Sequence, residues 1–163
     1  MKGYAGSKTK EAIRDLWMTP DFVFDFYNKR FRFTTDVAAS FDNRKCKDHR
    51  SEKFDGLLTG WGEMNWCNNP YSNTSRWVEK AISESVKGRA TVMLIPADTS
   101  VKWFKKAFEH CSECHFISGR LSFINEETKK PVSGNNKGSV VFVFDSKSPV
   151  KQYVTLIDRD SMK

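Results

Sequence analysis

The sequence lacks any long apolar run. No stretch approaches the roughly 20 consecutive apolar residues that cross a lipid bilayer, so we expect no membrane-spanning helix. The first residues, Met1-Lys2-Gly3-Tyr4-Ala5, lead into charged residues and contain no apolar signal core, which predicts a cytoplasmic location. Disorder is disfavoured too, because the 13 Phe and 5 Trp need a core to bury them.

Cysteine is scarce, and the four cysteines suit the reduced thiols of a cytosolic protein. Cys111-x-x-Cys114-His115 has the spacing of a haem-attachment motif, but such attachment occurs outside the cytosol. A zinc site would use these three residues with His110 or Cys46, and it lacks a second well-spaced pair. Packing roles are therefore favoured for the cysteines, and we expect no metal.

Internal repeats, linkers and a second domain are also missing. A chain of 163 residues suffices for one domain with a substantial core. We expect residues 1–16 to form a loose arm and a short helix, and residues 17–163 to form a single domain.

Positive charge is present in excess, with a net charge of +7 and a pI near 9.3. It gathers in three runs: Lys29 to Arg32, Arg44 to Arg50, and Lys129-Lys130 with Lys137. Several such runs on a small domain favour a polyanionic partner, because each neutralised phosphate releases counterions. The alternative is that these runs are solvated faces of an ordinary basic protein.

The apolar periodicity predicts alternating strands and helices, and hence a three-layer α/β domain with a mostly parallel sheet. Thr19 suits the N-cap of the helix expected at 21–29, and Pro20 suits the first position of that helix. The last core strands follow each other without room for a helix, which predicts an antiparallel pair at the sheet edge. The expected strands are 32–38, 64–67, 90–96, 114–117, 139–144 and 153–157, and the expected helices are 21–29, 72–86 and one carrying Val101, Phe104 and Phe108. Asp98, Thr99 or Ser100 is expected to cap the last of these helices. The expected buried face of 72–86 consists of Trp77, Val78, Ala81, Ile82 and Val86.

The stretch Met64 to Ser72 predicts a short buried strand that ends in a rigid polar turn. Ligands of open parallel sheets bind outside the carboxyl ends of the strands. Here the Asn68 side chain offers one carbonyl acceptor and the Asn69 backbone a second, Pro70 stiffens the turn, and the Tyr71 ring suits a stacked base. Such a turn suits a planar molecule with an exocyclic amine. It is equally typical of an ordinary strand-to-helix turn.

Asp36 to Ser40 ends the first expected core strand without the usual glycine-rich turn. The small residues Ala38 and Ser40 permit close approach of a ligand, and Asp36 is suited to bind an ammonium group or to orient the loop. On the residues alone, a solvated carboxylate at a strand end is at least as good an interpretation of Asp36. Asp42 and Asn43 lie where a ribose hydroxyl would be bound. Asp55 either accepts from an adenine amine or caps a turn.

Four motifs occur in order at short spacings: Trp17-x-Thr19-Pro20, Asp36-Val37-Ala38-Ala39-Ser40, Asp55-Gly56-Leu57 with Trp61, and Asn68-x-Pro70-Tyr71-Ser72. This series resembles the small phage-type DNA adenine-N6 methyltransferases of the Dam family, from about Trp17 to Asp145. In that family the first-strand segment is Asp-x-x-Ala-Ser rather than glycine-rich. The last motif is similar to the Asn/Asp-Pro-Pro-Tyr signature of amino methyltransferases, from which Asn69 departs by replacing the first proline.

The resemblance implies a class I, Rossmann-like methyltransferase fold with a terminal antiparallel hairpin. It also implies S-adenosyl-L-methionine as cofactor, double-stranded DNA as partner, the cytoplasm of a bacterial host as location, and no separate target-recognition domain. The loops at 41–53 and 125–138 are then the candidates for reading the target. The implied catalytic residues are Asn68, Asn69, Pro70 and Tyr71; the cofactor contacts are Thr19, Pro20, Asp36, Ala38, Ser40, Asp55 and Asn68; the DNA contacts are Arg120, Lys129, Lys130 and Lys137.

Two alternatives stay open. The same turn occurs in enzymes that methylate RNA or protein glutamine. The second alternative is a DNA-binding relative that has lost activity through Asn69. Arg120 itself has two interpretations, a phosphate contact or an ion pair with an internal acid.

Overall fold

The computed structural model describes residues 17–51, 55–132, 135 and 137–163. The arm and helix expected within residues 1–16 lie outside the described residues. None of the helices in the described ranges is long and apolar enough to cross a membrane.

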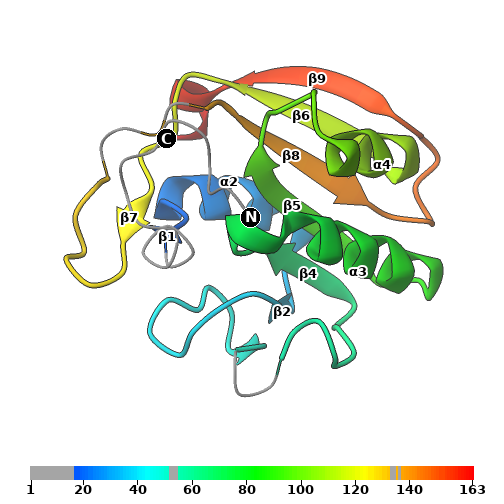
Figure 1. Ribbon diagram of the computed structural model, residues 1–163, viewed down its shortest axis with the longest axis horizontal. Helices are drawn as coiled ribbons and strands as arrows, with labels where there is room; N and C mark the ends of the chain where they lie inside the picture. The colour runs from blue at the N-terminus through cyan, green and yellow to red at the C-terminus, as the bar shows by residue number, and fades with distance from the viewer. Residues whose placement is uncertain (1–16, 52–54, 133–134, 136) are drawn as a thin grey trace.

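A seven-stranded sheet forms the middle layer, and six of its strands run parallel while β8 runs against both neighbours (Figure 1). This arrangement confirms the expected mostly parallel α/β sheet. In spatial order the strands are β3 (Asp48–His49), β2 (Thr35–Asp36), β4 (Met64–Cys67), β5 (Ala90–Pro96), β8 (Ser139–Phe144), β6 (Glu113–Ser118) and β9 (Tyr153–Asp158).

Helices cover both faces of the sheet. On one face lie α3 (Thr74–Val86) and α4 (Lys102–His110), and on the other lie α2 (Asp21–Phe31) and the short 3-10 helix η3 (Arg159–Met162). A separate two-stranded ribbon pairs β1 (Trp17–Met18) with β7 (Ile124–Asn125). The three expected layers are therefore present.

Strand β5 explains why the core has two halves. All seven of its residues are buried, as expected for a continuous apolar run in a central parallel strand. Successive side chains point to opposite faces, so Val92 and Leu94 pack with α2 while Met93 and Ile95 pack with α3 and α4.

The first core strand is shorter than expected, with only Thr35 and Asp36 in the ladder. Helix α2 continues to Phe31, and Arg32 then adopts a left-handed conformation at φ 53°. The residues expected to begin the strand are therefore used to end the helix.

The expected pairing of the last core strands is confirmed, but their expected place at the sheet edge is wrong. Strand β8 lies between β5 and β6 and bonds to both. The edge is β9, which pairs in parallel with β6 and leaves Leu156 72% exposed.

The expected helix caps are also wrong in two places. Thr19 makes no capping bond, and Pro20 takes the cap position with its carbonyl accepting from Val23 N at 3.1 Å. Helix α4 starts after Val101 without a side-chain cap, because Asp98 accepts from Ser100 instead.

Helix α3 is preceded by the 3-10 turn η2 (Tyr71–Asn73), so the expected helix from residue 72 begins in that turn and becomes α-helical at Thr74. Its expected buried face holds at Trp77, Val78 and Ala81, but Val86 lies past the sheet and is 80% exposed. Gly88 follows the helix at φ 83° and donates its N–H to Ser85, as a C-terminal glycine should.

Candidate active site

Asn68 follows the last residue of β4, and its side chain has a defined orientation. The Nδ2 group donates to the Trp17 carbonyl at 3.0 Å. No described residue bonds to its Oδ1 atom, which leaves that oxygen as an acceptor beside a hollow in the surface. The amide therefore has one end anchored and the other available.

Asn69 stiffens the turn in place of a proline ring. Its side chain is buried, and Nδ2 donates to the Pro70 carbonyl at 2.9 Å and to Thr74 Oγ1 at 3.1 Å. The backbone carbonyl of Asn69 receives no hydrogen bond from the described residues. Asn69 in place of the first proline thus still gives a fixed turn and a second acceptor.

Tyr71 opens the 3-10 turn η2, and its ring is half-buried. It meets the ring of Phe123 edge to face, with centroids 6.1 Å apart. Phe123 in turn stacks on Trp17 at 5.9 Å. This packing fixes the plane of the Tyr71 ring.

A small open hollow lies at the carboxyl ends of β2 and β4, holding about 230 Å³ of empty space with open solvent included. Its walls are Met18, Thr19, Asp36, Ala38, Asn43, Lys45, Trp66 and Asn68.

Asp36 is the acidic group of this hollow, and its carboxylate orients the following loop. Oδ2 accepts from the Lys45 backbone N–H at 2.9 Å, and Oδ1 accepts from the Ala38 N–H at 3.4 Å. Burial raises the pKa of Asp36 to about 6, although these two bonds oppose the rise. A buried carboxylate of this kind gains from an ammonium partner.

Thr19 supplies a polar atom to the same wall. Its Oγ1 is buried and has no hydrogen-bond partner among the described residues. A buried hydroxyl without a partner is costly, so Oγ1 is suited to a ligand atom. Pro20, the next residue, is not part of the lining and serves to start α2.

Three further residues with an expected cofactor role lie outside this lining, and the first of them, Asp42, is exposed. Ser40 Oγ donates to Glu126 Oε1 at 2.7 Å. Asp55 is exposed, and its Oδ1 accepts from the Leu57 N–H at 3.0 Å, which is the turn-capping alternative.

The Asp55-Gly56-Leu57 motif also has a packing role. A Cβ at Gly56 would collide with the Val37 carbonyl oxygen, so only glycine lets this turn approach the end of β2. Trp61 Nε1 donates to the Gly56 carbonyl at 2.6 Å. The motif holds the turn against the sheet.

Four residues near the hollow were not expected from the sequence: Met18, Lys45, Trp66 and Glu126. Met18 and Trp66 have the pattern of ordinary apolar residues, and Lys45 belongs to a basic run. Glu126 is distant in sequence and carries no motif. Only the expectation that ligands bind at the carboxyl ends of parallel strands predicts a place at the site for Trp66, near the end of β4.

The expected DNA contacts differ in their surroundings. Lys129 and Lys130 are exposed on the connection between β6 and β8. Arg120 is exposed and forms no ion pair with a described acid, which removes the internal-acid alternative within the described chain. Lys137 pairs with Asp98 at 2.5 Å and so links the connection to the end of β5.

The Cys-x-x-Cys-His segment lies in and before β6. His115 Nδ1 lies 3.0 Å from Tyr27 Oη and Nε2 lies 2.6 Å from Glu113 Oε2, so both ring nitrogens are engaged. Burial lowers the pKa of His115. Among the described residues, no group of three His, Cys, Asp or Glu side chains is arranged to hold a metal ion.

A family model described as DNA N-6-adenine-methyltransferase (Dam) matches residues 6–163. The chain belongs to this Dam family. The family expected from the motifs is thus confirmed, and the four motif segments of this Dam-family chain all fall within the matched residues.

Two phage relatives are similar over most of the chain. A DNA N-6-adenine-methyltransferase of Escherichia phage T1 is 38% identical over 158 residues, covering 86% of this chain and 66% of the relative. One of Haemophilus phage HP1 is 36% identical over 148 residues, covering 88% and 86%. The chain thus spans about two thirds of the T1 protein.

A solved structure from Listeria monocytogenes, a putative class I S-adenosylmethionine-dependent methyltransferase, has a TM-score of 0.55 at 13% identity. It covers 90% of this chain and 67% of the Listeria chain. This likeness confirms the expected class I fold.

Proposed function

We propose that this Dam-family chain transfers a methyl group from S-adenosylmethionine to the N6 amine of adenine in duplex DNA. The observation that carries the proposal is the anchored Asn68 amide, whose Oδ1 is available beside the Asn69 carbonyl at the end of β4. Membership of the family and the names of the phage relatives support the same interpretation.

The residues around the hollow fit this cofactor. The buried Asp36 carboxylate is suited to its ammonium group, and the unpartnered Thr19 Oγ1 offers a hydrogen bond. Asn43 and Ala38 complete the wall, one polar and one small. When bound, S-adenosylmethionine would supply an electrophilic methyl group on a sulfonium sulfur, with a neutral thioether as the leaving group and one amine proton lost to solvent.

Asn68 Oδ1 and the Asn69 carbonyl each accept a hydrogen bond from one N–H of the adenine amine. Two acceptors hold the amine so that its nitrogen lone pair leaves conjugation with the ring and becomes nucleophilic. The same oxygens stabilise the positive charge that develops on this nitrogen. Because they are fixed by Trp17 and by the turn, little reorganisation is needed.

Tyr71 holds the base. The amine of adenine cannot be reached within the helical stack, so the base is flipped out of the duplex. The Tyr71 ring, set in place by Phe123, provides the stacking surface.

Lys129, Lys130 and Arg120 contact DNA phosphates, and the protein acts in the cytoplasm of the bacterial host. Sequence readout falls to the basic loop of residues 41–50 and to the connection between β6 and β8, without a separate target-recognition domain. Salt-dependent phosphate contacts position the duplex, and base contacts select the target.

Transfer of a labelled methyl group tests the proposal. The purified chain is incubated with labelled cofactor and, separately, unmethylated duplex DNA, RNA and protein, and the modified base is then mapped. Label in duplex DNA as N6-methyladenine is expected. Label in RNA or protein alone contradicts the proposal, as does DNA binding without any heat of cofactor binding in calorimetry.

A further inference from the structure

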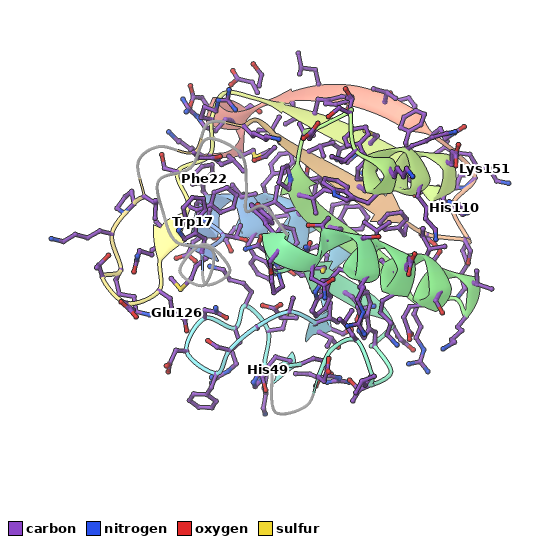
Figure 2. All side chains as sticks on the ribbon, in the orientation of Figure 1. Trp17, Phe22, His49, His110, Glu126 and Lys151 are labelled. Atoms are coloured by element: carbon purple, nitrogen blue, oxygen red, sulfur yellow. The ribbon has the colours of Figure 1, made fainter. Side chains whose placement is uncertain are left out.

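Glu126 joins two loops that are far apart in sequence. Its Oε1 accepts from Ser40 Oγ at 2.7 Å, and its Oε2 accepts from Asn43 Nδ2 at 3.2 Å. Figure 2 shows Glu126 where the yellow β6–β8 connection (residues 119–138) approaches the cyan loop that follows β2. One carboxylate thus bridges the β6–β8 connection and a loop of the cofactor hollow.

The Glu126 end of this bridge is held by a tight turn. Asn125 Oδ1 accepts from the backbone N–H groups of Glu127 and Thr128, at 2.9 and 3.0 Å. The Asn125 N–H donates to the Lys130 carbonyl at 3.0 Å, which closes the turn. The turn that presents Glu126 therefore also presents Lys129 and Lys130.

The other end of the bridge reaches the hollow. Asn43 Oδ1 accepts from the Ser40 N–H at 2.8 Å, and the Asn43 N–H donates to Ser40 Oγ at 3.2 Å. Glu126 accepts hydrogen bonds from the side-chain donors of both residues, Ser40 Oγ and Asn43 Nδ2. Asn43 is one wall of the hollow, and its amide is oriented because each end has a different partner.

The same connection also supports the catalytic turn. Strand β7 pairs Asn125 with Trp17, whose carbonyl anchors Asn68. Phe123, two residues earlier, packs on Tyr71. The β6–β8 connection thus contacts both the segments that hold Asn68 and Tyr71 and the loop that lines the hollow.

We propose that Glu126 is a positioning residue that couples DNA binding to cofactor binding; this inference rests on the proposed function. Phosphate contacts by Lys129 and Lys130 hold the turn, and with it the Glu126 carboxylate against Ser40 and Asn43. That stabilises the hollow with Asn43 in place. Coupling is reciprocal, so cofactor tightens DNA binding by the same factor.

The experiment is calorimetric titration of S-adenosylhomocysteine, the demethylated product, into the full chain with and without sheared unmethylated duplex DNA. In the wild type, DNA lowers the Kd by roughly fivefold or more. In Glu126→Ala the ratio of the two Kd values falls to near one. Glu127→Ala removes the same charge from an exposed neighbour and keeps the wild-type ratio.

Thermal melting shows whether Glu126→Ala folds. Should it not fold, Ser40→Ala reports on the same bridge, and its ratio falls between those of the wild type and one. Glu126→Gln keeps an acceptor oxygen and partly restores the ratio. A purely structural role would lower melting temperatures and leave the ratio unchanged.

Two results overturn the inference: a wild-type ratio near one, or equal ratios in Glu126→Ala and Glu127→Ala. Both leave the proposed function intact if the wild type still methylates DNA. Loss of cofactor binding and of methyl transfer in the wild type itself identifies a failure of the proposed function instead.

Discussion

The side-chain nitrogen of Asn68 donates to the backbone carbonyl of Trp17 across 3.0 Å. This bond assigns the two ends of the amide, since the nitrogen is used and the oxygen remains available as an acceptor. The segment before α2 therefore controls a side chain that follows β4, although 51 residues separate the two positions.

Replacing Asn68 tests that control. We expect Asn68→Ala to lower kcat by about 10²–10³-fold while cofactor still binds, because an acceptor of the developing charge is lost. Asn68→Asp keeps an acceptor but cannot donate to Trp17, so we expect a loss of roughly tenfold, equivalent to one hydrogen bond of about 1.4 kcal/mol. Single-turnover kinetics with calorimetry separates the two effects. Wild-type turnover in Asn68→Asp would contradict the role of the Trp17 anchor.

Asp36 makes stability depend on pH. Its pKa in the folded protein is about 6, raised by burial above 3.8, so the folded state holds more protons than the unfolded state between these values. The Asp36 contribution is therefore favourable below about pH 4 and is lost as the pH rises through 6. Because a tenfold change in proton affinity corresponds to about 1.4 kcal/mol, the loss in the free energy of unfolding is on the order of 1–3 kcal/mol.

Urea unfolding from pH 4 to 7 measures this effect as the difference between the wild type and Asp36→Asn. In Asp36→Asn the free energy of unfolding should lose the pH dependence that Asp36 contributes. Asp42→Asn, on the exposed part of the same loop, should keep the wild-type slope of unfolding free energy against pH. Parallel slopes for the wild type and Asp36→Asn would show that Asp36 does not titrate in this range.

Asn69 stabilises the turn through its two side-chain bonds. Asn69→Ala removes the bonds to the Pro70 carbonyl and Thr74 Oγ1, and we expect a loss of about 1–2 kcal/mol in the free energy of unfolding. Asn73→Ala is the matched control, because Asn73 lies in the same turn and makes no side-chain cap bond. Denaturant midpoints that shift equally in both variants would argue against the bracing role of Asn69.

Lys129 and Lys130 are exposed, and we expect each to neutralise one phosphate. Changing both to alanine should weaken DNA binding and reduce the slope of log K against log salt by about 1.8. Lys151→Ala removes an exposed charge on the far side of the molecule from Glu126, as Figure 2 shows, and should leave the slope unchanged. Fluorescence anisotropy at several salt concentrations gives the slopes; an unchanged slope in the double variant would place the duplex elsewhere.

Local chemistry explains what was predictable from the sequence. The run from Ala90 to Pro96 is continuously apolar and too short for a buried helix, so a central strand was the one consistent interpretation. The turn after Met64–Cys67 was equally predictable, because its residue types set the backbone directly.

Contacts between distant segments explain what was not predictable. The two-residue strands β1 and β7 carry no periodicity, and they pair only because the fold brings them together. Ser40 is bonded to Glu126, 86 residues away, and Lys137 is paired with Asp98, 39 residues away. No local pattern contains such partners, so the bridge to the hollow was found only in three dimensions.

The position of β8 has a consequence for synthesis. Strands β5 and β6 both leave the ribosome before the strand that lies between them and bonds to each. A nascent chain that stops short of Ser139 therefore leaves uncovered the edges of β5 and β6 that β8 later fills, and such edges readily pair with other chains. The interval between translation of Ser118 and of Phe144 is thus a period in which the growing protein is prone to aggregate.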